Sequence, residues 1–191
     1  MTDDSLAPLQ EPLVALQNVL DRFEEQGMII GGVAASLLGI PRFTADIDAL
    51  LLLDLEKIPD LLEAARQVGI SPRIDDVKSF AEKNRVLLLK HQESGINIDI
   101  SLGILPFEFE AVERSYLHKA GNLLLRLPTP EDLIILKAVA NRPRVIDDIK
   151  AIAQRHKNLD TERIKLWVEA FGEALEMPEL WRNIEGHLSV H

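Results

Sequence analysis

The predicted fold is decided by the stretch Ile30-Gly31-Gly32-Val33-Ala34-Ala35-Ser36-Leu37-Leu38-Gly39-Ile40-Pro41-Arg42-Phe43-Thr44-Ala45-Asp46-Ile47-Asp48. Its first apolar residues, with Met28 and Ile29 before them, are typical of a short strand, and residues 33–38 are typical of a helix. The glycine pair between them permits a tight backbone turn. A strand, a glycine turn and a helix start direct backbone N–H groups at one point, which indicates an anion-binding site.

Two aspartates end this stretch. Asp46 and Asp48 are separated by one isoleucine and lead into the apolar run 49–53. Alternate residues of a strand point to the same face, so the two carboxylates are expected side by side. They repel each other, and burial penalises both charges unless a cation neutralises them. Because Mg²⁺ supplies such a charge, the sequence predicts a combined phosphate and metal site.

Composition limits the possible functions. The 191 residues, 47% of them hydrophobic, fit one domain or a catalytic domain with a small helical appendage. No apolar run reaches the roughly 18 residues of a membrane span, and the N-terminus lacks a signal-peptide pattern, so we expect a cytoplasmic protein without membrane contact. The absence of cysteine excludes disulfides, thiolate zinc sites and a cysteine nucleophile.

Charge is distributed unevenly along the chain. The formal net charge of −10 argues against a protein that coats nucleic acid non-specifically. Residues 1–64 hold three Lys or Arg against twelve Asp or Glu, whereas residues 137–165 hold eight against four. From charge alone this second segment is more simply explained by ordinary solvated helix faces, and a candidate anion-facing surface is the alternative.

Hydrophobic spacing predicts an α+β body. Helices are expected at about 10–26 and 56–68, and a further strand at about 123–127. Residues 86–89 and 96–100 flank a turn-rich segment and predict a β-hairpin. In the second hairpin strand Asp99 lies on the polar face, so a solvated position is the plain alternative to a catalytic one.

The C-terminal third is helical in pattern. Thr129 is a suitable N-cap, Pro130 suits the first helical position, and two acidic residues follow, so a helix is expected to begin here. We therefore predict a catalytic domain over 1–128 and a helical subdomain over 129–191. Its helices are expected at about 130–140, 144–156, 161–175 and 178–188.

The glycine pair, the Asp-x-Asp pair and a later strand aspartate, in this order, resemble the nucleotidyltransferase superfamily that includes DNA polymerase beta. Within it the chain looks most like the AbiEii/AbiGii toxin-type nucleotidyltransferases. That second resemblance also rests on residues 128–137, which read PTPEDLIILK, and on the residues that follow them, Arg142, Arg144, Asp147 and Asp148.

The resemblance implies a nucleotidyltransferase fold, a mixed β-sheet packed by helices with a C-terminal helical subdomain. It also implies that Asp46, Asp48 and Asp99 are the catalytic residues and the ligands of two Mg²⁺ ions. A nucleoside triphosphate would lie over the glycine pair. The implied nucleotide-binding residues are Gly31, Gly32, Ser36, Arg42, Thr44, Lys137 and Arg144. Many superfamily members have serine at the second glycine position, and Gly32 lacks that hydroxyl.

These features favour a Mg²⁺-dependent nucleotidyltransferase that moves a nucleoside monophosphate from the triphosphate to an acceptor hydroxyl. The acceptor hypotheses are a tRNA end, a protein side chain or a small molecule. The toxin resemblance implies a toxin–antitoxin or abortive-infection role with a partner toxin or antitoxin protein. Inactivation of an aminoglycoside or lincosamide antibiotic is one alternative, and a non-catalytic nucleotide-binding or antitoxin-like module is another.

Overall fold

A computed structural model describes residues 4–140 and 144–188 of the chain. Five strands form a mixed sheet in the order β1-β2-β5-β4-β3, and two more form a separate antiparallel pair. The strands are β1 (Gly27–Ile30), β2 (Asp46–Leu52), β3 (Ile70–Pro72), β4 (Val86–His91), β5 (Asn97–Gly103), β6 (Tyr116–Ala120) and β7 (Leu123–Leu127). The α-helices are α1 (Gln10–Leu20), α2 (Gly31–Leu38), α3 (Ile58–Arg66), α4 (Val77–Asn84), α5 (Pro106–Glu113), α6 (Pro130–Ala140), α7 (Val145–Arg155), α8 (Thr161–Ala174) and α9 (Leu180–Glu185).

The centre of the sheet is the parallel pair β2 and β5. Most of their apolar side chains are buried, and those of Ile47, Leu51 and Ile98 completely so, which explains why these strands are apolar along most of their length. The register of the pair places Asp48 directly opposite Asp99. On its other side β2 pairs with β1 in antiparallel fashion. The sheet thus brings together residues that lie about fifty positions apart in the sequence.

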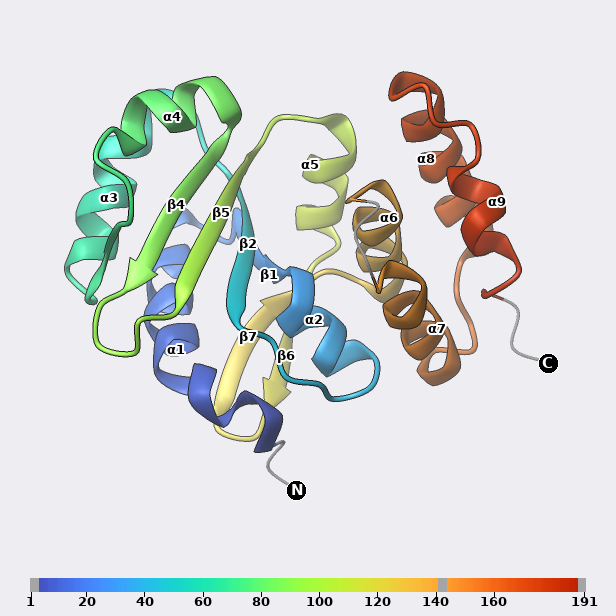
Figure 1. Ribbon diagram of the computed structural model, residues 1–191, viewed down its shortest axis with the longest axis horizontal. Helices are drawn as coiled ribbons and strands as arrows, with labels where there is room; N and C mark the ends of the chain where they lie inside the picture. Colours follow the sequence, from blue (N-terminus) through green and yellow to red (C-terminus); the bar gives the residue numbers. More distant parts are fainter. Residues whose placement is uncertain (1–3, 141–143, 189–191) are drawn as a thin grey trace.

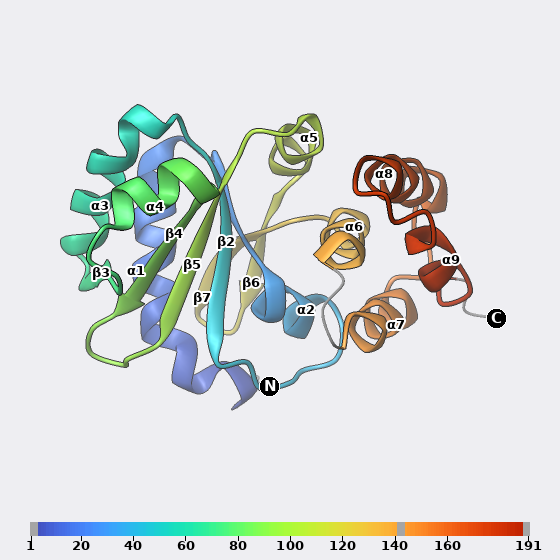
Figure 2. The same cartoon turned by 45° about the horizontal axis from the view of Figure 1, so that its top comes forward.

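Helix α2 lies between the sheet and the C-terminal helices. It packs against β1 and β2 on one side and against α6 and α7 on the other. Figures 1 and 2 show α6 to α9 gathered on one side of the molecule, with α1, α3 and α4 at the opposite side around the sheet. The stretch that follows the first strand therefore occupies the junction of the two regions.

Most sequence-predicted elements of the body are present, with some corrections. The predicted hairpin is confirmed as β4 and β5. The first helix ends earlier than residue 26, because α1 stops at Leu20 and a short 3-10 turn covers Asp21–Phe23. The glycine pair does not form a separate turn but begins α2 itself, with Gly31 in the left-handed region at φ 65°. Helix α5 and strand β6 were not predicted.

The predicted C-terminal helices are confirmed as α6 to α9. At the start of α6 the hydroxyl of Thr129 accepts a hydrogen bond from the backbone N–H of Asp132 at 3.2 Å, as expected of an N-cap. Arg142 lies outside the described residues, and the division of the chain into two domains at residue 128 stays a prediction. Within the described part of the chain, none of the helices combines the length and the apolar character needed to cross a membrane.

Candidate active site

The glycine pair packs directly against the aspartates of β2. A Cβ placed on Gly31 would overlap the carboxylate of Asp48, so the close approach of the helix start to this strand requires glycine at that position. Ile30, the residue before the pair, is the register partner of Asp48 on β1. The predicted neighbourhood of glycine pair and aspartate is therefore present in the fold.

The second glycine makes room for a threonine. A Cβ on Gly32 would lie 2.5 Å from the hydroxyl oxygen of Thr44 and 3.7 Å from a terminal nitrogen of Arg42. Serine at position 32 would therefore clash with Thr44, which is buried. The Thr44 hydroxyl in turn lies 3.3 Å from a carboxylate oxygen of Asp46, within hydrogen-bonding distance. A hydroxyl is thus present beside the glycine pair, but it comes from the α2–β2 loop.

The three candidate catalytic aspartates lie on neighbouring strands. Asp46 and Asp48 begin β2, and Asp99 lies on β5 opposite Asp48. Asp46 is exposed, whereas the other two are partly buried. Among the residues that the structure describes, no three His, Asp or Glu side chains are grouped closely enough to hold a metal ion. The assignment of these three aspartates as metal ligands stays a prediction.

Asp99 has an arginine partner. Its Oδ1 lies 2.8 Å from a terminal nitrogen of Arg73, in the segment after β3. The same oxygen is buried and receives no well-aligned hydrogen bond, so the contact is an ion pair with an acceptor position left over. A carboxylate oxygen with an unused acceptor position is the kind of ligand that Mg²⁺ prefers. Sequence reasoning missed Arg73 because residues 70–83 show no clear periodicity, and no motif marks the residue.

Ser36 holds the loop that joins α2 to β2. Its side chain is completely buried, and its hydroxyl both donates to the backbone oxygen and accepts from the backbone N–H of Arg42, each at 2.7 Å. Both hydrogen-bonding functions of the hydroxyl are therefore directed at this loop. The structure thus places Ser36 as a support for Arg42.

Arg42 and Lys137 converge on one buried carboxylate. Asp148 on α7 accepts hydrogen bonds from Arg42 Nε at 2.9 Å and Nη2 at 3.0 Å, and from Lys137 Nζ at 2.7 Å. Burial alone raises the pKa of Asp148, but the bonds from Arg42 and then Lys137 outweigh it, so the pKa lies below its usual value. This Asp148 cluster links the α2–β2 loop to α6 and α7. The cluster therefore brings together two predicted nucleotide-binding residues.

Arg144 lies elsewhere on the C-terminal helices. It is exposed at the start of α7 and lines a cavity with residues of α9, including Leu180 and Asn183. Its backbone is left-handed, at φ 72°.

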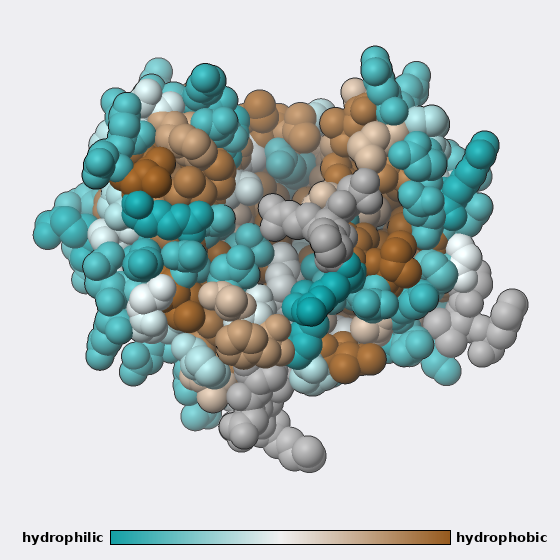
Figure 3. Space-filling model, in the orientation of Figure 1, coloured by the Kyte–Doolittle hydropathy of each residue, from teal (hydrophilic) through white to brown (hydrophobic). Residues whose placement is uncertain are grey.

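The surface is hollowed between the sheet and the C-terminal helices in Figure 3, with hydrophobic side chains on the rim of the hollow.

Comparison with known proteins shows what this arrangement is similar to. A family model described as a nucleotidyl transferase of unknown function (DUF2204) matches residues 13–185. No curated protein sequence matches the chain closely. The solution structure of the antibiotic-resistance factor ANT(2'')-Ia is similar with a TM-score of 0.58 and 15% identity, over 96% of this chain and 99% of that chain.

A second solved structure extends the likeness. An antigenic nucleotidyltransferase-like protein from Paracoccidioides brasiliensis is similar with a TM-score of 0.56 and 14% identity, over 94% of both chains. At such low identity these likenesses establish the fold only. The predicted nucleotidyltransferase fold is thereby confirmed.

Proposed function

The chain belongs to a family of nucleotidyl transferases of unknown function, and from this premise we propose that it is a Mg²⁺-dependent enzyme that moves a nucleoside monophosphate from a triphosphate to an acceptor hydroxyl. The observation that carries the proposal is the register of Asp48 opposite Asp99, with Gly31 packed against Asp48. Asp46, Asp48 and Asp99 would hold the metal. Bound Mg²⁺ would stabilise the negative charge on the attacking and leaving oxygens.

The reaction needs one bond to form and one to break. The acceptor oxygen bonds to the α-phosphorus of the triphosphate, and the bond between that phosphorus and the bridging oxygen of pyrophosphate breaks. The hydroxyl proton passes to a carboxylate, which we assign to Asp99. Asp99 suits this role because its buried Oδ1 has an unused acceptor position. Arg73 would hold the Asp99 charge until the metal binds.

The glycine pair and the Asp148 cluster would receive the triphosphate. The first turn of α2 would supply backbone N–H groups to the phosphates. Thr44 would supply the hydroxyl that serine provides in many superfamily members. Lys137 and Arg42, both held by Asp148, would supply positive charge at the same junction. Ser36 would contribute through the loop that it supports, and Arg144 stays a candidate from sequence alone.

The acceptor is a separate question. The tail motif of residues 128–137 favours a toxin–antitoxin or abortive-infection role, with a tRNA end or a protein hydroxyl as acceptor and a partner toxin or antitoxin protein. An antibiotic acceptor is the second candidate, because the net charge of −10 attracts a cationic drug. ANT(2'')-Ia, whose fold is similar, has been solved in complex with adenylyl-2''-tobramycin.

The test is transfer of labelled phosphate. The protein is incubated with Mg²⁺ and each of the four α-³²P-labelled triphosphates in turn, with total RNA, a bacterial protein extract or an aminoglycoside as acceptor. We expect label in one acceptor class and its loss in the Asp48→Asn variant. The matched control is Asp54→Asn, which changes an exposed carboxylate just after β2 and should retain transfer. Transfer by Asp48→Asn at the rate of the unmodified protein would contradict the proposed site.

A further inference from the structure

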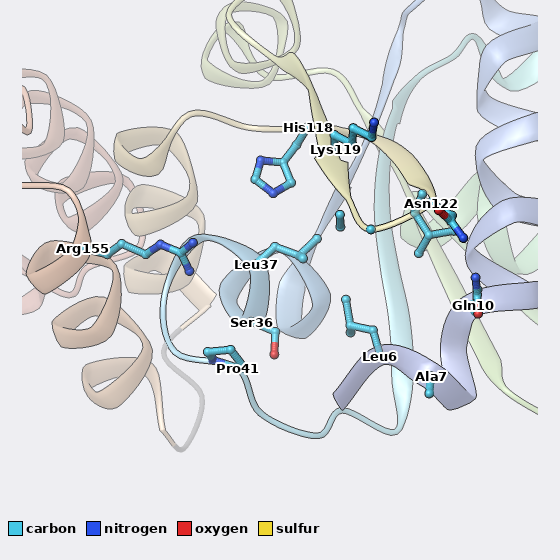
Figure 4. A pocket seen from close by; sticks show the side chains of 13 residues that line it. Leu6, Ala7, Gln10, Ser36, Leu37, Pro41, His118, Lys119, Asn122 and Arg155 are labelled. Carbon is cyan, nitrogen blue, oxygen red and sulfur yellow. The ribbon is translucent and has the colours of Figure 1, made fainter. Parts of the chain in front are cut away.

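A cavity of about 590 Å³ lies apart from the three aspartates and the glycine pair. It opens between the N-terminal turn, the C-terminal part of α2, the β6–β7 hairpin and the end of α7 (Figure 4). Leu6, Leu37 and Leu123 give it an apolar floor, and His118 and Arg155 line its wall. This size and this mixture of apolar surface with a few polar groups are typical of small-molecule sites.

The titratable side chains that line the cavity are all basic. His118, Lys119 and Arg155 all contribute to it, and none of its described lining residues is an Asp or Glu. Within the described part of the chain none of these three side chains forms an ion pair, whereas Arg42 and Arg163 each hold buried carboxylates. Basic side chains without a carboxylate partner at one cavity are unexpected in a chain of net charge −10. They indicate a ligand that brings its own negative charge.

The Arg155 side chain is held in place beside His118. Arg155 donates from Nη1 to the backbone oxygen of Gly39 at 3.1 Å, which fixes the guanidinium at the end of α2. Figure 4 shows the side chains of Arg155 and His118 pointing into the same space, with Lys119 directed away from them. Burial, followed by the charges of Arg155 and His156, lowers the pKa of His118. An anion between the two side chains would offset the unfavourable positive potential at His118.

We propose that this cavity binds a small organic phosphate, with the phosphate between His118 and Arg155 and the apolar part against Leu37 and Leu123. A phosphate monoester carries close to two negative charges at neutral pH, so it can pair with Arg155 and also favour protonation of His118, which the single charge of a carboxylate does less strongly. The guanidinium fork suits two phosphate oxygens.

The cavity also touches the loop that carries the candidate active-site residues. Pro41 and Ser36 line it, and Ser36 bonds to the backbone of Arg42. A bound phosphate compound would therefore contact the same loop that places Arg42 and Thr44 beside the glycine pair. This contact makes the cavity a second site from which the position of that loop is influenced.

Binding is measured by NMR of the histidine side chains in the full chain without divalent metal, with phenyl phosphate as the probe. We expect saturable shifts of the His118 resonances and a rise in the His118 pKa, because a bound anion favours the charged imidazolium. Arg155→Gln should weaken the binding by about tenfold or more, since it removes a charge-assisted contact to phosphate. Inorganic phosphate should bind more weakly by about tenfold, because it lacks the apolar part. Benzoate should leave His118 unchanged.

Two controls separate this cavity from the proposed active site. Lys137→Ala removes a proposed triphosphate contact and should leave the His118 shifts intact. Arg66→Gln changes an exposed arginine that pairs with Glu63, so it is the matched control for Arg155→Gln and should also leave the His118 shifts intact. His118 resonances that do not respond to phenyl phosphate would overturn the proposal. Equal affinity for inorganic phosphate and phenyl phosphate, equal affinity for benzoate, or loss of the response in Lys137→Ala would overturn it as well.

Discussion

Two aspartates of the C-terminal helices each hold two cations, but in different surroundings. Asp132 on α6 is completely buried and accepts hydrogen bonds from Arg114 Nε at 3.1 Å and Arg163 Nε at 2.8 Å. Asp148 on α7 is 7% exposed and holds Arg42 and Lys137. The first group of three joins α6 to the end of α5 and to α8, whereas the second joins the α2–β2 loop to α6 and α7.

The difference lies in what else the cations contact. Arg163 also binds Glu110 at 2.7 Å, so its charge is shared by two carboxylates, and their hydrogen bonds outweigh burial and raise its pKa. Arg42 instead reaches the glycine pair, where it lies 3.7 Å from the place a Gly32 Cβ would occupy. Charge compensation around Asp132 is therefore complete within the helices. Around Asp148 two cations share one carboxylate. In our proposal these cations bind the triphosphate, so the same kind of interaction serves the fold in one place and a ligand in the other.

The largest effect is expected from Asp132→Ala. Removal of the carboxylate leaves the partly buried Arg163 without one of its partners, and broken buried ion pairs typically cost about 3 to 5 kcal/mol of unfolding free energy. Urea unfolding followed by circular dichroism measures the loss. The control is Glu63→Gln, which removes an exposed ion pair with Arg66 and should change stability far less. Equal losses in the two variants would show that burial of Asp132 contributes little.

Lys137→Ala should act on nucleotide binding more than on stability. Loss of a charge-assisted phosphate contact costs about 1.5 to 3 kcal/mol, or roughly ten- to a hundredfold in affinity for Mg²⁺-nucleotide. Titration calorimetry with each triphosphate measures the change, and Lys78→Ala is a control because Lys78 is exposed in a pair with Glu82. If a folded Lys137→Ala protein bound Mg²⁺-nucleotide with unchanged affinity, Lys137 would serve only to stabilise the fold, as Arg163 does.

Asp148→Asn should show a pH-dependent loss of stability. The pKa of Asp148 is lowered in the fold, so its carboxylate stabilises the native state at pH values above the unfolded pKa of about 3.9. That contribution disappears as the pH falls through the folded pKa. We expect a loss of about 1 to 2 kcal/mol at pH 7 that shrinks below about pH 4. Unfolding curves of both proteins at pH 7 and pH 3 test this, and a difference that grows toward low pH would contradict it.

The sequence predicts features that depend on neighbouring residues better than features that depend on contacts between distant segments. The strand, helix and Asp-x-Asp pattern of residues 30–48 is local, and so is the cap at Thr129, so periodicity and capping rules were sufficient to predict the central elements. The hairpin placed Asp99 on a polar face, but only the parallel pairing of β2 with β5 set it opposite Asp48. Such pairing between distant segments depends on the packing of the whole sheet.

The ion pairs could not be predicted from the sequence for the same reason. Asp148 and Arg42 are 106 positions apart, and Arg73 and Asp99 lie in segments whose pairing no local pattern specifies. Ser36 looked like a phosphate donor because it follows the glycine pair, but its hydroxyl serves the Arg42 backbone. Thr44 shows the reverse case, because glycine at position 32 of α2 leaves room for the hydroxyl of a residue in the following loop.

The smallest effect is expected for the ion pair between Arg73 and Asp99, and it is an effect on metal affinity. Arg73 and Asp99 are 25% and 32% exposed, so their contact is weaker and more easily exchanged than the buried contacts of Asp132. A divalent cation at Asp99 has to compete with the guanidinium. Arg73→Gln should therefore tighten Mn²⁺ binding by about threefold to tenfold in titration calorimetry without nucleotide. Arg73→Lys keeps the charge and should resemble the unmodified protein, as should Arg66→Gln, which changes a remote exposed arginine. Weaker Mn²⁺ binding by Arg73→Gln would mean that Arg73 orients Asp99 for the metal instead of competing with it. If the unmodified protein did not bind Mn²⁺, the proposed metal site itself would be wrong.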